Sequence, residues 1–453
     1  MSARPQPQIL WLTNLPAPYR FPIWARMAEC FDLKVAFLLA EKNWRNWTVP
    51  ERKSWKHEHL SLRSKNIKDI DLIPSIRGAK KLLEDIDLLV LGGWESPFYI
   101  RTLLLAKRRK IPVIEFYEST QDSHRFKNII IRKIRSSILS QADFIVTAGS
   151  ASTKAVEAMG IAPEKIVTLF NPVDVSWFHL FARNHRTPVT SGHRYIYAGQ
   201  LIERKNVATI LRSFAAIGND DDTLTIAGDG PLAQDLKILA ASLGIAESVT
   251  FAGYRSQEEL AKLYAASNTL ILASTNEVWG LVVNEALASG LHVIVSDKCG
   301  VAEFVRDMDG AFICKTDQQS LQEKMQASSR QWDGYIEEPE ILKYTPEKFA
   351  DEIIGLLEEL LRSLSNPDLI WFTNIPTPYR IPTWRILHTR IKLHLIFLAK
   401  TEPGRDWNLE SLLKGFSHSF MKVRARYPVS LAPIYFNFAK PIREIRKFRA
   451  KIR

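Results

Sequence analysis

The chain of 453 residues has little of several features that would define its class. Its three cysteines, Cys30, Cys299 and Cys314, are scattered and show neither metal-ligand spacing nor an even framework for disulfides. No apolar run is long enough to span a membrane, and residues 1–8 lack the pattern of a secretory signal. We therefore expect neither a disulfide-stabilised fold nor a membrane-spanning one, and we predict a reducing, cytoplasmic compartment.

Acidic residues are scarce only at the end of the chain. The formal net charge is +12, and residues 367–453 hold 17 Lys and Arg against 5 Asp and Glu. The first 366 residues hold 44 of each sign, so this larger part is neutral. With 46% hydrophobic residues and length for two or three domains, the composition is typical of a globular protein. No nucleic-acid partner is predicted.

Apolar runs of strand length alternate with helical stretches through the first 366 residues. This alternation predicts an α/β fold with parallel sheets. Because open α/β sheets bind ligands beyond the carboxyl ends of their strands, the loops after the strands are the places to look for a site. We expect strands at residues 9–12, 33–39, 87–91, 112–116, 144–147, 195–198, 224–227, 249–253, 269–273 and 293–296.

The stretch from Asn276 to Gly290 carries the strongest functional pattern. It follows an expected strand and predicts a helix that begins near Leu281 behind Gly280 and is capped by Gly290. The start of such a helix offers free N–H groups and a positive dipole end to a phosphate. Glu277 precedes this helix and Glu285 lies within it, and carboxylates accept hydrogen bonds from the vicinal hydroxyls of sugars and riboses. Together these groups suggest a nucleotide sugar; the alternative is two solvated glutamates flanking an ordinary αβ unit.

Seven residues separate the two glutamates, with E-x-x-G-L and E-A-x-A-x-G around them. This pattern resembles the signature of family 4 retaining glycosyltransferases. The resemblance implies the GT-B fold, in which two Rossmann-like domains face each other across a cleft, and a reaction without a metal cofactor. It also implies that Glu285 holds the ribose hydroxyls, Glu277 the transferred sugar, and the Gly280 and Leu281 amides the diphosphate.

Two further segments fit the resemblance. Gly199 opens a segment in which the family has G-R-L and then a lysine that neutralises the donor diphosphate. Lys205 matches the lysine, whereas Gln200 stands where the arginine is expected, and we predict that Arg204 supplies the missing charge. Gly228 begins the turn Gly-Asp-Gly-Pro, which matches the family's next glycine turn and completes the expected donor side.

The acceptor side is less defined. The loop after the first expected strand carries two prolines and Arg20 where many relatives have glycines. By the resemblance, Glu118 or His124 would contact the acceptor or the transferred sugar; the alternative for Glu118 is a turn or cap. The basic stretches 101–110 and 125–135 predict helices packed on the sheet, with contact to an anionic membrane as the alternative.

The end of the chain repeats its beginning. Residues 369–384 copy residues 9–24 at a constant offset of 360, including both tryptophans and the Pro-x-Pro-Tyr-Arg run. This indicates a duplication. We predict an acceptor-side domain at 1–185, a nucleotide-sugar domain at 186–345, a crossover helix at 346–366 and a partial repeat at 367–453. The repeat is a truncated tandem transferase, an accessory lobe, or a segment whose basic end, 441–453, lies on anionic lipid.

The predicted function is retaining transfer of a sugar from a UDP- or GDP-sugar to a saccharide or lipid-linked saccharide hydroxyl. Cell-envelope or exopolysaccharide synthesis, at the inner face of the membrane, would be the setting. Two alternatives stay open: a GT-B epimerase, which would turn over its substrate without an acceptor, and a non-catalytic nucleotide-sugar binding protein.

Overall fold

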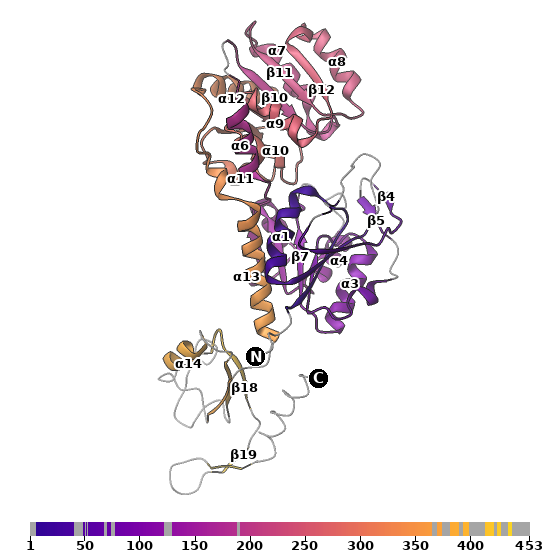
Figure 1. The fold of residues 1–453 in the computed structure, drawn as a ribbon, viewed down its shortest axis with the longest axis vertical. Coiled ribbons are helices and arrows are strands. Elements are labelled where there is room, and N and C mark those ends of the chain that lie inside the picture. Colours follow the sequence, from indigo (N-terminus) through magenta and orange to yellow (C-terminus); the bar gives the residue numbers. More distant parts are fainter. Residues whose placement is uncertain are drawn as a thin grey trace. The chain divides into compact units, whose positions relative to one another are not determined.

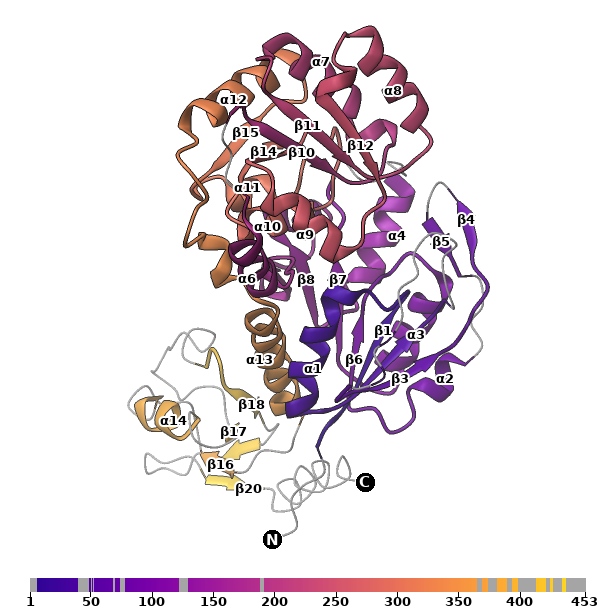
Figure 2. The same cartoon turned by 45° about the horizontal axis from the view of Figure 1, so that its top comes forward.

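The protein is described here by a computed structural model of residues 6–39, 49, 51, 53–67, 70–73, 78–121, 129–187, 191–364, 369–373, 381–388, 393–397, 413–420, 424–426 and 434–436. The chain divides into two compact units, Met1–Leu356 and Leu357–Arg453. The first unit holds two parallel sheets, each covered by helices on both faces (Figures 1 and 2). We call the parts that carry them the first domain (6–174) and the second domain (175–345).

The first domain has a seven-stranded sheet in the order β3-β2-β1-β6-β7-β8-β9, and every neighbouring pair is parallel. β1 therefore lies where the strand order changes direction, between β2 and β6. The strands are β1 (Gln8–Thr13), β2 (Asp32–Phe37), β3 (Lys56–His59), β6 (Leu88–Leu91), β7 (Val113–Tyr117), β8 (Phe144–Ala148) and β9 (Ile166–Leu169), beside a small pair, β4 (Lys65–Ile67) and β5 (Ile70–Leu72). The helices are α1 (Phe21–Cys30), α2 (Ala79–Leu82), α3 (Pro97–Arg108), α4 (Ile129–Leu139) and α5 (Gly149–Glu157). The next helix along the chain, α6 (Val175–His185), packs on helices of the second domain.

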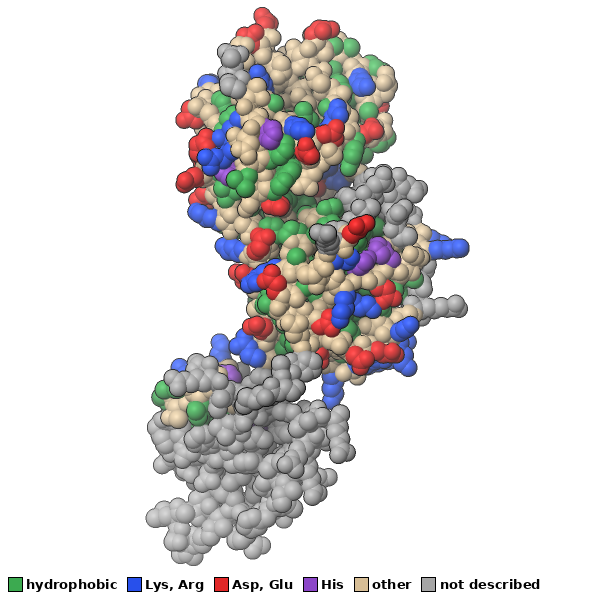
Figure 3. Space-filling model, viewed as in Figure 1, with side chains coloured by type: hydrophobic (Ala, Val, Ile, Leu, Met, Phe, Trp, Pro, Cys, Tyr) green, Lys and Arg blue, Asp and Glu red, His purple; other side chains and the backbone are tan. Residues whose placement is uncertain are grey.

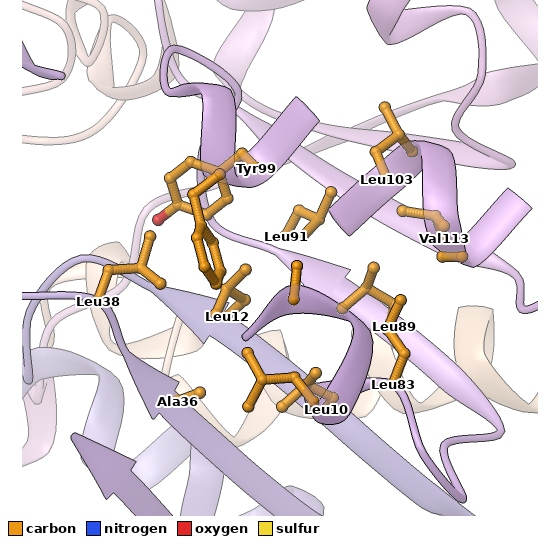
Figure 4. Packing of buried hydrophobic residues seen from close by; sticks show 14 of the residues in the cluster. Leu10, Leu12, Ala36, Leu38, Leu83, Leu89, Leu91, Tyr99, Leu103 and Val113 are labelled. Carbon is orange, nitrogen blue, oxygen red and sulfur yellow. The ribbon is translucent and has the colours of Figure 1, made fainter. Parts of the chain in front are cut away.

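Leucines from two adjacent strands, β1 and β6, contribute to the core on one face of this sheet. Leu10 and Leu12 of β1 pack with Leu89 and Leu91 of β6 and with Tyr99 of α3, all essentially inaccessible to solvent (Figure 4). Because successive side chains of a strand point to opposite faces, a parallel sheet buried on both faces needs apolar residues at consecutive positions. This explains why the strands were recognisable as continuous apolar runs.

The second domain repeats this design with six parallel strands in the order β12-β11-β10-β13-β14-β15. The strands are β10 (Arg194–Ala198), β11 (Thr223–Ala227), β12 (Val249–Gly253), β13 (Thr269–Leu272), β14 (His292–Ser296) and β15 (Ala311–Cys314). The helices are α7 (Val207–Ile217), α8 (Ala233–Ser242), α9 (Gln257–Ala265), α10 (Leu281–Ala288), α11 (Ala302–Val305) and α12 (Gln318–Gln331). All ten strands expected from the sequence are present, within one or two residues of their expected ends.

Helix α13 (Pro346–Leu364) begins at the expected residue. The Thr345 hydroxyl accepts a hydrogen bond from the Lys348 amide at 3.2 Å, as an N-cap does. In the first turns of α13, the Phe349 ring lies 6.1 Å from that of Phe116 on β7, and Asp351 accepts a hydrogen bond from Arg26 of α1 at 2.9 Å. The start of α13 therefore packs on the first domain. The domain limits that the sequence suggested, 185, 345 and 366, stay a prediction.

In the second unit, β16 (Leu369–Thr373), β17 (Leu393–Phe397) and β18 (Ser417–Phe420) form a parallel sheet, with α14 (Ile381–His388) between the first two strands. β16 and β17 pair Thr373 with Phe397, and β1 and β2 pair Thr13 with Phe37, so the register is the same 360 positions earlier. β17 and β18 pair Phe397 with Phe420, whereas β2 and β3 pair Phe37 with His59, so this register departs by one position from the offset of 360. The remaining described strands are β19 (Arg424–Arg426) and β20 (Ile434–Phe436). That this unit arose by duplication stays a prediction.

Acidic and basic side chains are interspersed over the described part of the first unit on the face shown in Figure 3, as its neutral composition leads one to expect. Within the described ranges, no helix is both long enough and apolar enough to cross a bilayer.

Candidate functional site

Glycines stand at the carboxyl ends of β10, β11 and β12, where backbone hydrogen bonds join the three strand ends. The Gly199 amide bonds to the Ala227 carbonyl at 2.9 Å, and the Gly228 amide bonds to the Gly253 carbonyl at 2.8 Å. A Cβ atom on Gly228 would lie 1.7 Å from the carbonyl oxygen of Gly199. Only glycine fits at this position, and the missing side chain leaves the strand ends open to a ligand.

A pocket of about 650 Å³ opens at these strand ends. Gly199 and Gly228, both expected on the donor side, contribute to its wall, and the Tyr254 side chain, 74% exposed, stands beside it. This volume lies within the range of small-molecule sites. The lining residues are Ala198, Gly199, Gln200, Ala227, Gly228, Asp229, Gly230, Tyr254, Arg255, Leu260 and Val282.

The start of α10 reaches the same pocket through Val282. Gly280 precedes α10 with φ of +108°, in the left-handed region, and a Cβ atom there would lie 2.7 Å from Leu272 of β13. Glycine therefore lets the chain turn sharply from β13 into the helix. Leu281 and Val282 begin the helix, where backbone N–H groups have no partner within the helix. The first turn of α10 thus directs free donors and a positive dipole end to this side of the domain.

Two cations meet one carboxylate beside α10. Glu277 accepts a hydrogen bond from Arg204 at 3.1 Å and another from Lys205, and the Lys205 and Glu277 side chains are only 11% and 14% exposed. The Glu277 amide donates to the Lys298 carbonyl at 3.2 Å, which holds this residue against the loop after β14. Arg204, Lys205 and Glu277 therefore lie together in the structure, and their predicted roles toward a donor stay a prediction.

Glu285 lies one turn into α10, partly buried, where it accepts a hydrogen bond from the Tyr264 hydroxyl at 3.1 Å. Burial raises the pKa of Glu285 to about 7, although the hydrogen bond from Tyr264 acts in the opposite direction. A carboxyl group that is half-ionised near neutral pH and partnered on one side only has capacity to accept hydrogen bonds from a ligand.

On the acceptor side, Glu118 forms an ion pair with buried Arg20 at 3.0 Å. Trp11 and Phe116 lie beside the guanidinium of Arg20, within 6 Å. The hollow that these residues line has only about 20 Å³, room for about one water molecule. Glu118 thus pairs with an arginine that follows β1, and its contact with an acceptor stays a prediction. His124 lies outside the described residues.

Apart from Glu118 and His124, the structure therefore places the expected residues in three neighbouring groups on the second domain: the glycine-walled pocket, the Glu277 ion cluster and the start of α10 with Glu285. Tyr254 and Tyr264 were not among the residues predicted from the sequence. Tyr254 follows Gly253 at a strand end, a signal that could have marked it. Tyr264 sits mid-helix, and its nearness to Glu285 follows only from the packing of α9 against its neighbours. Among described residues, no cluster of three or more His, Cys, Asp or Glu side chains is suited to a metal ion.

A known protein family matches the part of the chain that holds the second domain. Residues 183–357 match the family described as "Glycosyl transferases group 1". The chain is 28% identical over 228 residues to alpha-monoglucosyldiacylglycerol synthase of Streptococcus pneumoniae, a match that covers 46% of this chain and 49% of that protein. It is 33% identical over 112 residues to N-acetyl-alpha-D-glucosaminyl L-malate synthase of Bacillus anthracis, covering 24% of this chain and 29% of that protein. The chain thus spans about half the length of the first relative and under a third of the second.

Solved structures match a larger part of the chain. Alr3699/HepE of Anabaena, in complex with UDP, superposes with a TM-score of 0.62 at 15% identity, covering 78% of this chain and all of that one. The fold is GT-B. Sucrose-phosphate synthase of Thermosynechococcus elongatus gives a TM-score of 0.59 at 16% identity over 79% of this chain and all of its own. The GT-B arrangement expected from the sequence, two parallel-sheet α/β domains, is therefore confirmed.

Proposed function

We propose that this chain is a glycosyltransferase that moves a sugar, with retention of configuration, from a nucleoside diphosphate sugar to a hydroxyl acceptor. The observation that carries the proposal is the juxtaposition of the glycine-walled pocket, the start of α10 and the Arg204–Lys205–Glu277 cluster. The match to a glycosyltransferase family supports it, because the matched residues 183–357 include all of these groups.

The donor diphosphate would be neutralised by Arg204, Lys205 and the first amides of α10, without a metal ion. A helix start and two cations offer the donors that phosphate oxygens need. In the structure Glu277 accepts hydrogen bonds from both cations. On donor binding, the cations would turn to the diphosphate and Glu277 to the hydroxyls of the transferred sugar. Glu285 would hold the ribose hydroxyls, since it lies within the helix whose start meets the diphosphate.

Tyr254 offers a flat, exposed ring on which a nucleobase can stack at the wall of the pocket. The Anabaena structure that shares this fold was solved with UDP, and another of the same protein with UDP-glucose. We therefore propose a UDP-sugar as the first donor to test, ahead of a GDP-sugar.

The chemistry follows from what the site supplies. The bond between the anomeric carbon and the phosphate oxygen breaks, and a bond to the acceptor oxygen forms on the same face. The acceptor proton passes to the leaving phosphate, so the protein needs no nucleophile of its own. Catalysis rests on stabilising the charge that develops on the diphosphate, which is the role given to Arg204, Lys205 and α10.

We further propose that the acceptor is a saccharide or lipid-linked saccharide that binds on the first domain near Glu118, and that this domain contacts anionic membrane. The consecutive crossover helices α3 and α4 expose the apolar residues Leu104 and Ile134 among basic side chains. Flotation with phosphatidylglycerol vesicles tests the contact: binding that falls in Leu104→Ser and with added salt supports it. No flotation, or flotation equal on neutral vesicles, refutes it.

The donor is identified by thermal shift and nucleotide release with UDP-, GDP- and ADP-sugars, using the wild-type chain and Glu285→Gln. We expect one nucleotide series to raise the unfolding temperature, and this gain to be lost in the variant. Turnover without acceptor would instead identify an epimerase. A folded chain that binds a donor but releases no nucleotide with any acceptor would be a binding protein. No response to any donor would refute the proposal.

A further inference from the structure

The side chain of Trp279 joins residues 276–280, which we call the donor loop because they include Glu277 and Gly280, to the first domain. Trp279 lies between Glu277 and Gly280, is 3% exposed and packs on Phe304 with the ring centroids 5.4 Å apart. On its other side is Gly149, the first residue of α5 in the first domain. A Cβ atom on Gly149 would lie 2.7 Å from Cζ3 of the indole. The ring therefore rests directly against the backbone of the first domain.

Gly149 suits this contact for two separate reasons. Its φ of +73° lies in the left-handed region, which disfavours residues with a Cβ atom. Its bare backbone also leaves the space that the indole occupies. The need for space depends on Trp279, whereas the backbone conformation disfavours a Cβ atom whatever residue stands at 279. Substitutions can therefore separate the two effects.

Backbone hydrogen bonds attach the same loop to the segment after β14. The Gly300 amide donates to the Glu277 carbonyl at 3.0 Å, and the Val301 amide donates to the Trp279 carbonyl at 3.1 Å. These bonds fix the loop within the second domain, whereas the indole fixes it against the first. A movement at Gly149 would thus be passed to Glu277, two residues before Trp279, and to Gly280, the residue after it, which are the proposed sugar and diphosphate ligands.

We propose that Trp279 is a positioning residue: its packing on Gly149 sets the donor loop, so that the first domain controls the affinity for the donor without touching it. This inference rests on the proposed function, because it takes Glu277 and Gly280 as donor ligands. A displacement of about 1 Å in such ligands is enough to weaken their contacts strongly.

The test is the dissociation constant for UDP-glucose, by calorimetry, together with the urea midpoint of unfolding. Gly149→Ala forces a Cβ atom against the indole, and we expect the affinity to fall at least about fivefold, the lower end of coupling between sites. Gly160→Ala is the matched control: Gly160 follows the same helix with φ of +79°, and a Cβ atom there meets nothing within 4 Å. It carries the same backbone strain and should leave the affinity unchanged.

A second pair of variants guards against failure to fold. Trp279→Phe replaces the indole by a smaller ring without Cζ3, so the double variant Gly149→Ala/Trp279→Phe should regain affinity that Gly149→Ala loses. Trp279→Leu, without backbone strain, should weaken binding by a similar factor. The inference is overturned if Gly149→Ala binds like Gly160→Ala, if the double variant regains nothing, or if Trp279→Leu binds like wild type. A folded wild type that binds no nucleotide sugar would instead refute the proposed function.

Discussion

Replacing Glu285 by glutamine should make the ligand-free protein more stable and the donor complex weaker. In the folded chain the carboxyl group has a pKa of about 7 against an ordinary value of 4.5, with burial as the main cause. The folded state therefore holds this proton more tightly than the unfolded state. Above pH 4.5 ionisation costs stability, and the cost grows until the pH passes about 7.

At 1.36 kcal/mol for each unit of pKa, the cost of ionising Glu285 is about 3 kcal/mol at pH 8 and under about 1 kcal/mol at pH 5. Glu285→Gln removes the charge and keeps an oxygen for the Tyr264 hydroxyl. We expect its free energy of unfolding in urea to exceed that of wild type by up to about this amount at pH 8, with a small difference at pH 5. Tyr264→Phe, which lacks the hydrogen bond that favours the charged form, should raise the pKa of Glu285 further.

The raised pKa of Glu285 also predicts how the affinity for the donor depends on pH. Ribose hydroxyls prefer the ionised carboxylate, whose population rises from roughly a tenth at pH 6 to nine-tenths at pH 8 when the pKa is about 7. UDP-glucose itself does not titrate in this range, so its affinity for wild type should rise about tenfold. Glu285→Gln should bind more weakly with no such slope. A stability difference that is the same at pH 5 and pH 8, or an equal slope in the variant, would refute this reasoning.

Three further predictions concern the second domain. Lys205→Ala leaves the nearly buried carboxylate of Glu277 without its closest cation, so the free energy of unfolding in urea should fall by about 3 kcal/mol. The affinity for UDP-glucose should fall more than tenfold, and binding equal to that of wild type would rule out contact between Lys205 and the diphosphate. Gly228→Ala places a Cβ atom 1.7 Å from the Gly199 oxygen and should abolish UDP-glucose binding in calorimetry, while Gly244→Ala, at φ of +73° with open space, should only lose about 1 kcal/mol of stability. Burial lowers the pKa of His193 to about 4, so the unfolded state binds the proton more tightly than the folded state. The free energy of unfolding should therefore fall by about 3 kcal/mol as the pH falls from 6.5 to 4. His193→Gln should flatten this dependence in an acid titration monitored by circular dichroism.

The sequence determined ten of the thirteen strands of the two large sheets, because strands buried on both faces must be apolar at consecutive positions, a pattern that is local. It did not predict β3, β9 and β15, which lie at sheet edges and are more exposed. It also determined the turn at Gly280 and the helix from Leu281, since a left-handed turn needs glycine and a helix start follows from its neighbours. Glu277 was noted because it lies just before this helix, whereas Lys205 was found through the resemblance of its segment to a glycosyltransferase family. The offset of 360 between the two ends of the chain was likewise visible without coordinates.

Tertiary structure alone decided which partners these residues have. Arg204 and Lys205 reach Glu277 from more than 70 positions away, and Tyr264 reaches Glu285 from the helix before. Burial, which raises the pKa of Glu285, depends on the whole domain closing around it and leaves no mark in the local sequence. The contact of Trp279 with Gly149 joins two domains, and each residue by itself has an ordinary local explanation. Local chemistry fixes elements and turns, whereas distances between elements are fixed only by how they pack.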